Sequence, residues 1–278
     1  MTECHGADEA GRGSSFALHL AHPYRLPVSA IDIRLSPFAG REELLLAEAS
    51  ALDMTLAVAL LDSTALRSDG TVLDWAKLPC TDIDAALLHL RRAVLGDAIR
   101  ADVVCPSAAC GKRIDISFSV GEFLAHHSSR RVRGVEPAAD GWFRFADGSA
   151  TFRPPTGADI AAAATGGDPE RELAHRCVRP ADLPGSAWRR AVRALEAMAP
   201  SLAETLLGEC AECGVAVDVY FDARSFALRE LRDQAAFIYG DTHMLACHYH
   251  WAEADILALP RSRRIHYVDM LAASQGGS

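Results

Sequence analysis

Apolar side chains recur every three or four residues across residues 81–95, a spacing that places them on one face of a helix. The members of this stripe are Ile83, Leu87, Leu90 and Val94. Thr81 can cap the helix at its start, and Gly96 stands where helices commonly end. The pattern therefore predicts an amphipathic helix over residues 81–95.

Other stretches predict further helices and short strands. Residues 34–67 have a helical pattern, and helical stripes return after residue 219 and continue to about residue 272. Apolar residues in short alternating runs predict strands at residues 101–104, 114–120 and 215–219. Each of these strands adjoins a pair of cysteines.

Changes in composition divide the chain into four parts. Residues 1–15 are mostly small and polar and predict a flexible tail. An N-terminal helical half with the first cysteine pair spans residues 16–127, and a C-terminal helical half with the second pair spans residues 151–278. Between them, residues 128–150 are polar, arginine-rich and glycine-containing, which predicts a linker or a long loop. Each half places helices before a cysteine pair and a strand, which indicates a weak internal pseudo-symmetry.

The overall charge and hydropathy disfavour several classes of protein. The chain has 278 residues and a formal net charge of −9, whereas dedicated nucleic-acid binders usually carry a basic excess. No apolar run reaches the roughly 18 residues needed to span a bilayer, and the N-terminus lacks the pattern of a signal peptide. We therefore expect a cytoplasmic protein without a membrane partner. A basic cluster at Arg130, Arg131 and Arg133 fits a solvated loop, but it leaves a nucleic-acid-binding regulatory protein as an alternative.

Four of the eight cysteines form two closely spaced pairs. Four residues separate Cys105 from Cys110, two separate Cys210 from Cys213, and a glycine and an alternating strand follow each pair. In a chain without export signals, such spacing indicates a bound metal rather than disulfides. Two facing pairs would give zinc its preferred tetrahedron of thiolates, with no open position for catalysis. The alternatives are free thiols and a redox dithiol at Cys210 and Cys213.

These features together predict a mainly helical α+β protein, with two helical halves joined around a small zinc-ribbon-like β element. The gap between the cysteine pairs is long, but the entropy of loop closure rises only slowly with length, so a helical insertion within a ribbon is acceptable. The sequence contains no phosphate-binding glycine loop, no dinucleotide fingerprint and no G-x-S-x-G elbow. We therefore expect a protein that is not an enzyme.

A histidine-rich stretch near the C-terminus allows a second interpretation. On a helix, His243, Cys247 and His250 share one face and could bind another metal ion, although hydrogen bonding within a helix bundle is the favoured interpretation. A metal-dependent hydrolase that uses His243, His248 and His250 is therefore a further alternative function.

Five segments in a specific order resemble a known family. They are DIRLSPFAGREE at 32–43, DIDAALLHLRRAVLGDAIRADVVCP at 82–106, FRPPTGADIAAAA at 152–164, ECAECG at 209–214 and HMLACHYHWAEADILALPRSRRIHYVDML at 243–271. Together they resemble the T4-type phage baseplate protein family, which is related to the hub assembly proteins of contractile phage tails and occurs in loci for phage-derived contractile injection systems. The resemblance covers most of residues 32–272. The chain departs from the family pattern in its wider first cysteine pair and in Ala252, where a serine is expected.

The resemblance implies a baseplate assembly protein, either a chaperone or a minor component, that binds hub or wedge proteins of a contractile tail. It implies no small-molecule substrate. Aromatic, large apolar and arginine side chains commonly anchor protein interfaces, and the C-terminal segment is rich in them. The candidate protein-binding residues are Trp251, Ile256, Leu257, Arg261, Arg263 and Arg264. Burial of Trp251 and the apolar residues in the core is the alternative.

Overall fold

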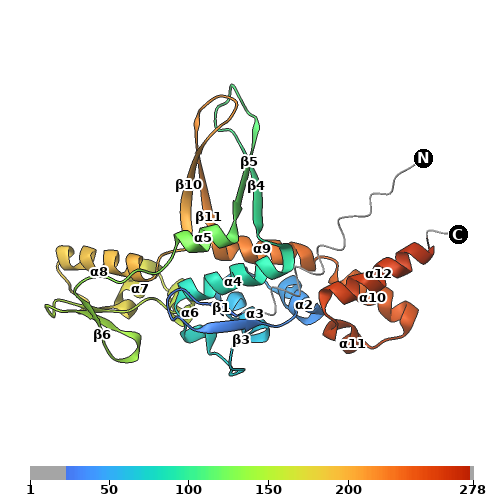
Figure 1. Ribbon diagram of the computed structural model, residues 1–278, viewed down its shortest axis with the longest axis horizontal. Helices are drawn as coiled ribbons and strands as arrows, with labels where there is room; N and C mark the ends of the chain where they lie inside the picture. The colour runs from blue at the N-terminus through green and yellow to red at the C-terminus, as the bar shows by residue number, and fades with distance from the viewer. Residues whose placement is uncertain (1–22, 276–278) are drawn as a thin grey trace.

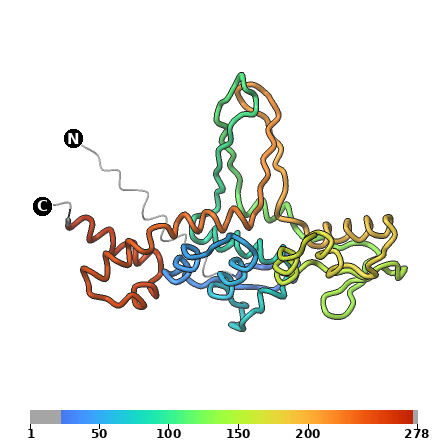
Figure 2. The backbone as a smooth tube through the Cα atoms, turned by 180° about the vertical axis from the view of Figure 1, so that it is seen from behind, coloured from blue at the N-terminus to red at the C-terminus, as the bar shows by residue number. Residues whose placement is uncertain are grey.

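A computed structural model describes residues 23–275, so the tail predicted at residues 1–15 lies outside the described residues. A central helical body carries one lobe on each side and a long arm that projects away from the helices (Figure 1). Figure 2 shows the same arrangement from behind. Helices and small sheets of two to four strands make up the described residues, which confirms the mixed helical and strand composition expected from the sequence.

The central body packs helices around a small antiparallel sheet. Its main core combines residues 26–123 with residues 202–235 and therefore draws on both sides of the predicted linker. The carboxylate of Asp82 is buried and accepts hydrogen bonds from the amides of Val28 and Ser29, which attaches the N-terminal sheet to the central helix. The elements are β1 (Tyr24–Arg25), β2 (Asp32–Leu35), α2 (Gly40–Glu48), α3 (Met54–Thr64), β3 (Ala65–Arg67), η1 (Trp75–Lys77), α4 (Cys80–Leu95) and α9 (Ala223–Ala235).

The helix predicted at residues 81–95 is confirmed as α4, which ends at Leu95 just before Gly96 in a positive-φ conformation. The uniform helical pattern predicted for residues 34–67 is wrong. That stretch begins and ends in strands β2 and β3, and Asp53 starts a second helix by accepting a hydrogen bond from a backbone amide of its first turn. A side chain that caps a new helix here competes with continuation of the previous one.

The arm consists of two antiparallel hairpins that stand side by side (Figure 1). Strand β4 (Ala98–Val104) pairs with β5 (Arg113–Ser119), and β10 (Ala203–Glu209) pairs with β11 (Ala216–Asp222). Each hairpin forms its own two-stranded sheet, so the two hairpins meet through side chains rather than through a shared ladder of backbone hydrogen bonds. Helix α5 (Val120–His126) follows the first hairpin and α9 follows the second.

One lobe forms on residues 130–198 and has its own apolar core. Part of the stretch predicted as a linker or long loop is an ordered hairpin in this lobe, because Phe145 of β7 packs into that core. The elements of the lobe are β6 (Val135–Pro137), η2 (Ala139–Gly141), β7 (Phe143–Phe145), β8 (Thr151–Phe152), α6 (Gly157–Ala164), α7 (Pro169–Cys177), β9 (Val178–Arg179) and α8 (Gly185–Met198).

The C-terminal lobe lies on the opposite side of the body (Figures 1 and 2). Helices α10 (Ile238–Tyr249), α11 (Glu253–Ala258) and α12 (Arg261–Gln275) enclose a small core around Leu245, Ile256 and Leu271. Within residues 23–275, no helix is both long enough and apolar enough to cross a bilayer.

Candidate metal centre

The tip of the arm brings the two cysteine pairs together. Cys105 follows β4 and Cys110 lies in the turn that leads to β5, while Cys210 and Cys213 occupy the equivalent turn between β10 and β11. These four are the single group of three or more potential metal ligands that converges within the described part of the chain, and all four ligand atoms lie within 4.8 Å of one another. The site residues predicted from the cysteine spacing therefore meet in space.

The two turns close in the same way although they differ in length. The amide of Cys105 donates to the carbonyl of Lys112 at 2.8 Å, and the amide of Cys210 donates to the carbonyl of Val215 at 2.9 Å. In both turns the acceptor lies two residues after the second cysteine. The two extra residues of the first pair are thus accommodated inside the turn.

A glycine after each pair permits these turns. Gly111 has φ +56° and Gly214 has φ +71°, a left-handed conformation that glycine adopts without steric cost. The amide of Gly214 donates to the carbonyl of Cys210 at 2.8 Å and so closes the second turn from inside. The glycines therefore let each turn reverse direction with both of its cysteine sulfurs on the same side.

The distances between sulfurs fit tetrahedral coordination. The Sγ atoms of Cys105 and Cys213 are 3.6 Å apart, and those of Cys110 and Cys210 are 3.9 Å apart. A zinc ion with Zn–S bonds of about 2.3 Å requires sulfurs about 3.8 Å apart at the edges of its tetrahedron. The four thiols are thus compatible with a single tetrahedral metal ion, and four sulfur ligands leave no position for a catalytic water.

The protonation of the cluster depends on backbone amides and on burial. Amides of Glu212 and Cys213 donate to the sulfur of Cys210 and lower the pKa of that thiol to about 7. At Cys105 the amide of Ser107 acts in the same direction, but burial and contacts with the other sulfurs prevail and raise the pKa to about 12. One thiolate therefore forms readily, and further protons leave when a cation replaces them.

The arm has little apolar packing that could replace a metal ion. Cys105, Cys210 and Val217 are the buried residues of a small cluster at the tip, and half-buried Val103 and Val219 pack against it. An isolated two-stranded hairpin is marginally stable in water. With seven-residue strands, the tip lies roughly 20 Å from the helical body. A metal ion at the tip would therefore join two hairpins that have few other contacts there.

The second metal site considered as an alternative for α10 is not formed among the described residues. His243 and Cys247 are exposed and neighbour each other, with the sulfur 3.8 Å from the ring nitrogens. His250 follows the last helical residue and has φ +54°, so it leaves the face predicted from helical spacing. Among the described residues these three do not converge as a ligand group, and the open metal site that a hydrolase would need has no support here.

Several of the candidate protein-binding residues make contacts inside the molecule rather than lying free at its surface. Ile256, Leu257 and Arg264 are buried. Arg264 pairs with Glu43 of α2 and, at 3.3 Å, with Asp241 of α10, so it joins the C-terminal lobe to the body. These residues have the composition of an interface because they form one, between the C-terminal lobe and the body of the same chain.

The other three candidates differ from one another. Arg261 is half-buried and pairs with Glu43 at 3.2 Å, which extends the same contact. Trp251 is half-buried in an aromatic group, with its ring 4.9 Å from that of Tyr249 and 5.1 Å from that of Tyr267. Arg263 is exposed and remains available to a partner.

The basic cluster considered for nucleic-acid binding lies away from the tip of the arm. Arg130, Arg131 and Arg133 are exposed in the segment between α5 and β6, and the amide of Arg130 bonds to the carbonyl of Ala197 on α8. On the arm itself Arg113 pairs with Asp102 of the neighbouring strand. The described structure therefore does not join the basic cluster and the cysteine site into one basic face.

The sequence interpretation missed two exposed apolar side chains on the arm. Leu207 is 79% exposed and Tyr220 is 69% exposed. In the register of β10 and β11, Tyr220 lies opposite Thr205 and Leu207 lies opposite Asp218, so the two side chains are diagonal neighbours on one face. Leu207 follows inward-facing Leu206 in the sequence. Two consecutive leucines interrupt the alternation of apolar and polar residues, so neither the strand nor the outward-facing leucine was predicted.

Comparisons with known proteins found no match to this chain. No protein-family model matches it, and no curated protein or solved structure matches it significantly.

Proposed function

We propose that this protein assembles the baseplate of a contractile phage tail or of a phage-derived contractile injection system. In this proposal it acts in the cytoplasm, as a chaperone or as a minor component, by binding hub or wedge proteins without catalysing a reaction. The observation that carries the proposal is the ordered resemblance of five segments across residues 32–272 to the T4-type phage baseplate protein family.

The proposal includes one structural zinc ion at the tip of the arm, held by Cys105, Cys110, Cys210 and Cys213. Its support is the convergence of four sulfurs, two of whose separations are close to a tetrahedral edge. On this view the two hairpins are the halves of one zinc ribbon, interrupted by the lobe between them. Helices precede and follow each hairpin, which accords with the pseudo-symmetry suggested by the sequence.

The shape and surface of the arm support a role in binding proteins. It projects from the helical body (Figure 1) and exposes Leu207 and Tyr220 on one face. Tyrosine and large apolar side chains are enriched at protein interfaces. A metal ion at the tip would hold this face in a fixed orientation, which lowers the conformational cost of binding.

A tagged chain purified from the native host, followed by mass spectrometry, tests the proposal. Hub or wedge proteins should accompany the chain, and recovery from finished particles would identify it as a component rather than a chaperone. Tail proteins absent from both the soluble and the particle fractions, with nucleic acid enriched instead, would overturn the proposal in favour of the regulatory alternative.

Two variants refine this experiment. Tyr220→Ser combined with Leu207→Ser removes the apolar face of the arm and should reduce recovery of tail proteins. Val72→Ser is a matched control, because Val72 is 79% exposed outside the arm. If the control reduces recovery as much as the arm variant does, the arm is not the binding surface.

A further inference from the structure

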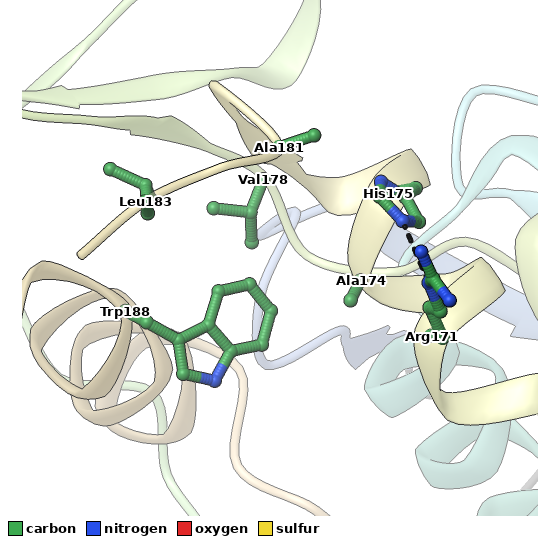
Figure 3. A pocket seen from close by; sticks show the side chains of 7 residues that line it. All are labelled: Arg171, Ala174, His175, Val178, Ala181, Leu183 and Trp188. Carbon is green, nitrogen blue, oxygen red and sulfur yellow. Dashed lines mark hydrogen bonds between the residues drawn. The ribbon is translucent and has the colours of Figure 1, made fainter. Parts of the chain in front are cut away.

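A groove runs between the central body and the lobe that carries α6, α7 and α8. Two hollows, with volumes of about 430 Å³ and about 290 Å³, share Ala174, Val178 and Trp188 in their linings and therefore adjoin each other. Figure 3 shows the smaller hollow, where the indole of Trp188 extends toward Val178 and Ala174. Neither the cysteine site nor the apolar face of the arm contributes to this groove.

One face of α8 forms an apolar wall of the larger hollow. Trp188, Val192 and Leu195 of α8, and Ala199 just after its end, recur at helical spacing and all line the groove. The first three are half-buried in the described structure, although they are large and apolar. From Trp188 to Ala199 this wall extends about 16 Å, the length of three helical turns. The dimensions suit a short helix laid along α8.

The larger hollow is acidic at its rim and neutralised at its floor. Glu170 and Glu196 line it, are exposed, and have no cationic partner among the described residues. On the floor, Asp84 accepts two hydrogen bonds from Arg224, at 2.8 and 2.9 Å, so this pair is already satisfied. The charge left over at the rim is therefore negative and favours a basic ligand.

The smaller hollow differs from the larger one in its polar groups. Arg171 and His175 line it, and their side chains are joined by a hydrogen bond of 3.4 Å, drawn as a dashed line in Figure 3. Leu183 and Trp188 provide its apolar wall. The preference for a basic ligand is thus confined to the larger hollow, and a ligand would place its cationic end there.

We propose that this groove binds an amphipathic helix of a partner protein. The helix carries large apolar side chains at i, i+4 and i+7 against α8, and lysine or arginine at the end near Glu170 and Glu196. Charge complementarity and the three-turn length of the apolar wall favour this occupant over a small apolar molecule. The proposal stands on the groove alone and would survive if the partner were not a baseplate protein.

Two synthetic helical probes of about 14 residues test the proposal. Both carry the same leucine stripe, and they differ in having lysine or glutamate at one end. Fluorescence anisotropy with the full-length chain should show binding of the lysine probe about tenfold tighter than binding of the glutamate probe. Equal binding of the two probes, or no binding of either, would overturn the proposal.

Substitutions locate the binding on the protein. Val192→Glu should weaken binding of the lysine probe about tenfold, whereas Ser186→Glu, which adds the same charge at an exposed position outside the groove, should leave it unchanged. Glu170→Gln combined with Glu196→Gln alters no apolar contact and should remove most of the preference for lysine over glutamate. A preference that persists in this double variant would contradict the assigned role of the acidic rim.

Two further outcomes would assign the groove to another occupant and overturn the proposal. The first is saturable binding of laurate that Val192→Glu abolishes, together with no binding of either probe. The second is self-association in sedimentation experiments that the same substitution abolishes, since a second copy of the chain would then fill the groove.

Discussion

Replacing Arg264 with methionine should destabilise the protein by roughly 3 kcal/mol, the low end of the range for breaking a buried ion pair. The side chain of Arg264 is 1% exposed, and its guanidinium lies between Glu43 of α2 and Asp241 of α10. Methionine fills part of the same volume but leaves Glu43 buried without its main partner. The expected loss of stability is at the low end of the range because Arg261 remains 3.2 Å from the other oxygen of Glu43.

The loss should depend on pH in a direction that the structure fixes. Burial raises the pKa of Glu43, and Arg264 opposes that rise. Without Arg264 the folded-state pKa rises further, while the unfolded carboxyl keeps its ordinary value of about 4.3. The folded state then retains a proton that the unfolded state loses, so stability falls as pH increases above about 4.3. The variant should therefore approach wild-type stability toward pH 4 and differ most at neutral pH.

Urea unfolding followed by circular dichroism, at several pH values, measures this effect. Arg263→Met is the matched control, because Arg263 is exposed one position away and its loss should change stability by less than about 0.5 kcal/mol. Equal unfolding midpoints for the two variants at neutral pH would refute the reasoning, as would a loss for Arg264→Met that grows toward acid pH.

Three other substitutions test separate contacts. Cys213→Ser should lower the melting temperature in a thermal scan, because metal binding and folding are coupled. Cys247→Ser, at another exposed cysteine, should not lower it, and equal melting temperatures for the two variants would count against the metal. Gly40→Ala should cost about 1–3 kcal/mol in urea unfolding, since its Cβ would lie 2.9 Å from the Cα of Leu257; a neutral result would show that α11 can move aside. Asp53→Ala should cost about 1 kcal/mol by removing the cap of α3, and unchanged stability would contradict that role.

Local signals in the sequence predicted the elements that depend on near neighbours. The stripe that includes Ile83 and Leu87 predicted α4 because its members pack into the main core, although most of the remaining helix surface is buried as well. The spacing of the cysteines together with Gly111 and Gly214 predicted two equivalent turns, which the structure forms. In these cases the residues that determine the structure lie within one helix or one turn.

Contacts between segments that are distant in the sequence could not be predicted from local patterns. Arg264 and Glu43 are 221 residues apart, and nothing near either residue indicates that the arginine is buried. The sequence pattern therefore gave no sign that part of the C-terminal segment, through Arg264, forms an internal contact. Strand β10 was missed for a related reason, since outward-facing Leu207 interrupts the alternation that a half-buried strand usually shows.

Metal analysis of the purified chain tests the central claim of a zinc-stabilised arm most directly. Inductively coupled plasma mass spectrometry should find one zinc ion per chain in the wild-type protein and in Cys247→Ser, and almost none in Cys210→Ser. Wild-type protein that folds and melts cooperatively without stoichiometric zinc, or a Cys210→Ser variant that retains it, would contradict the claim.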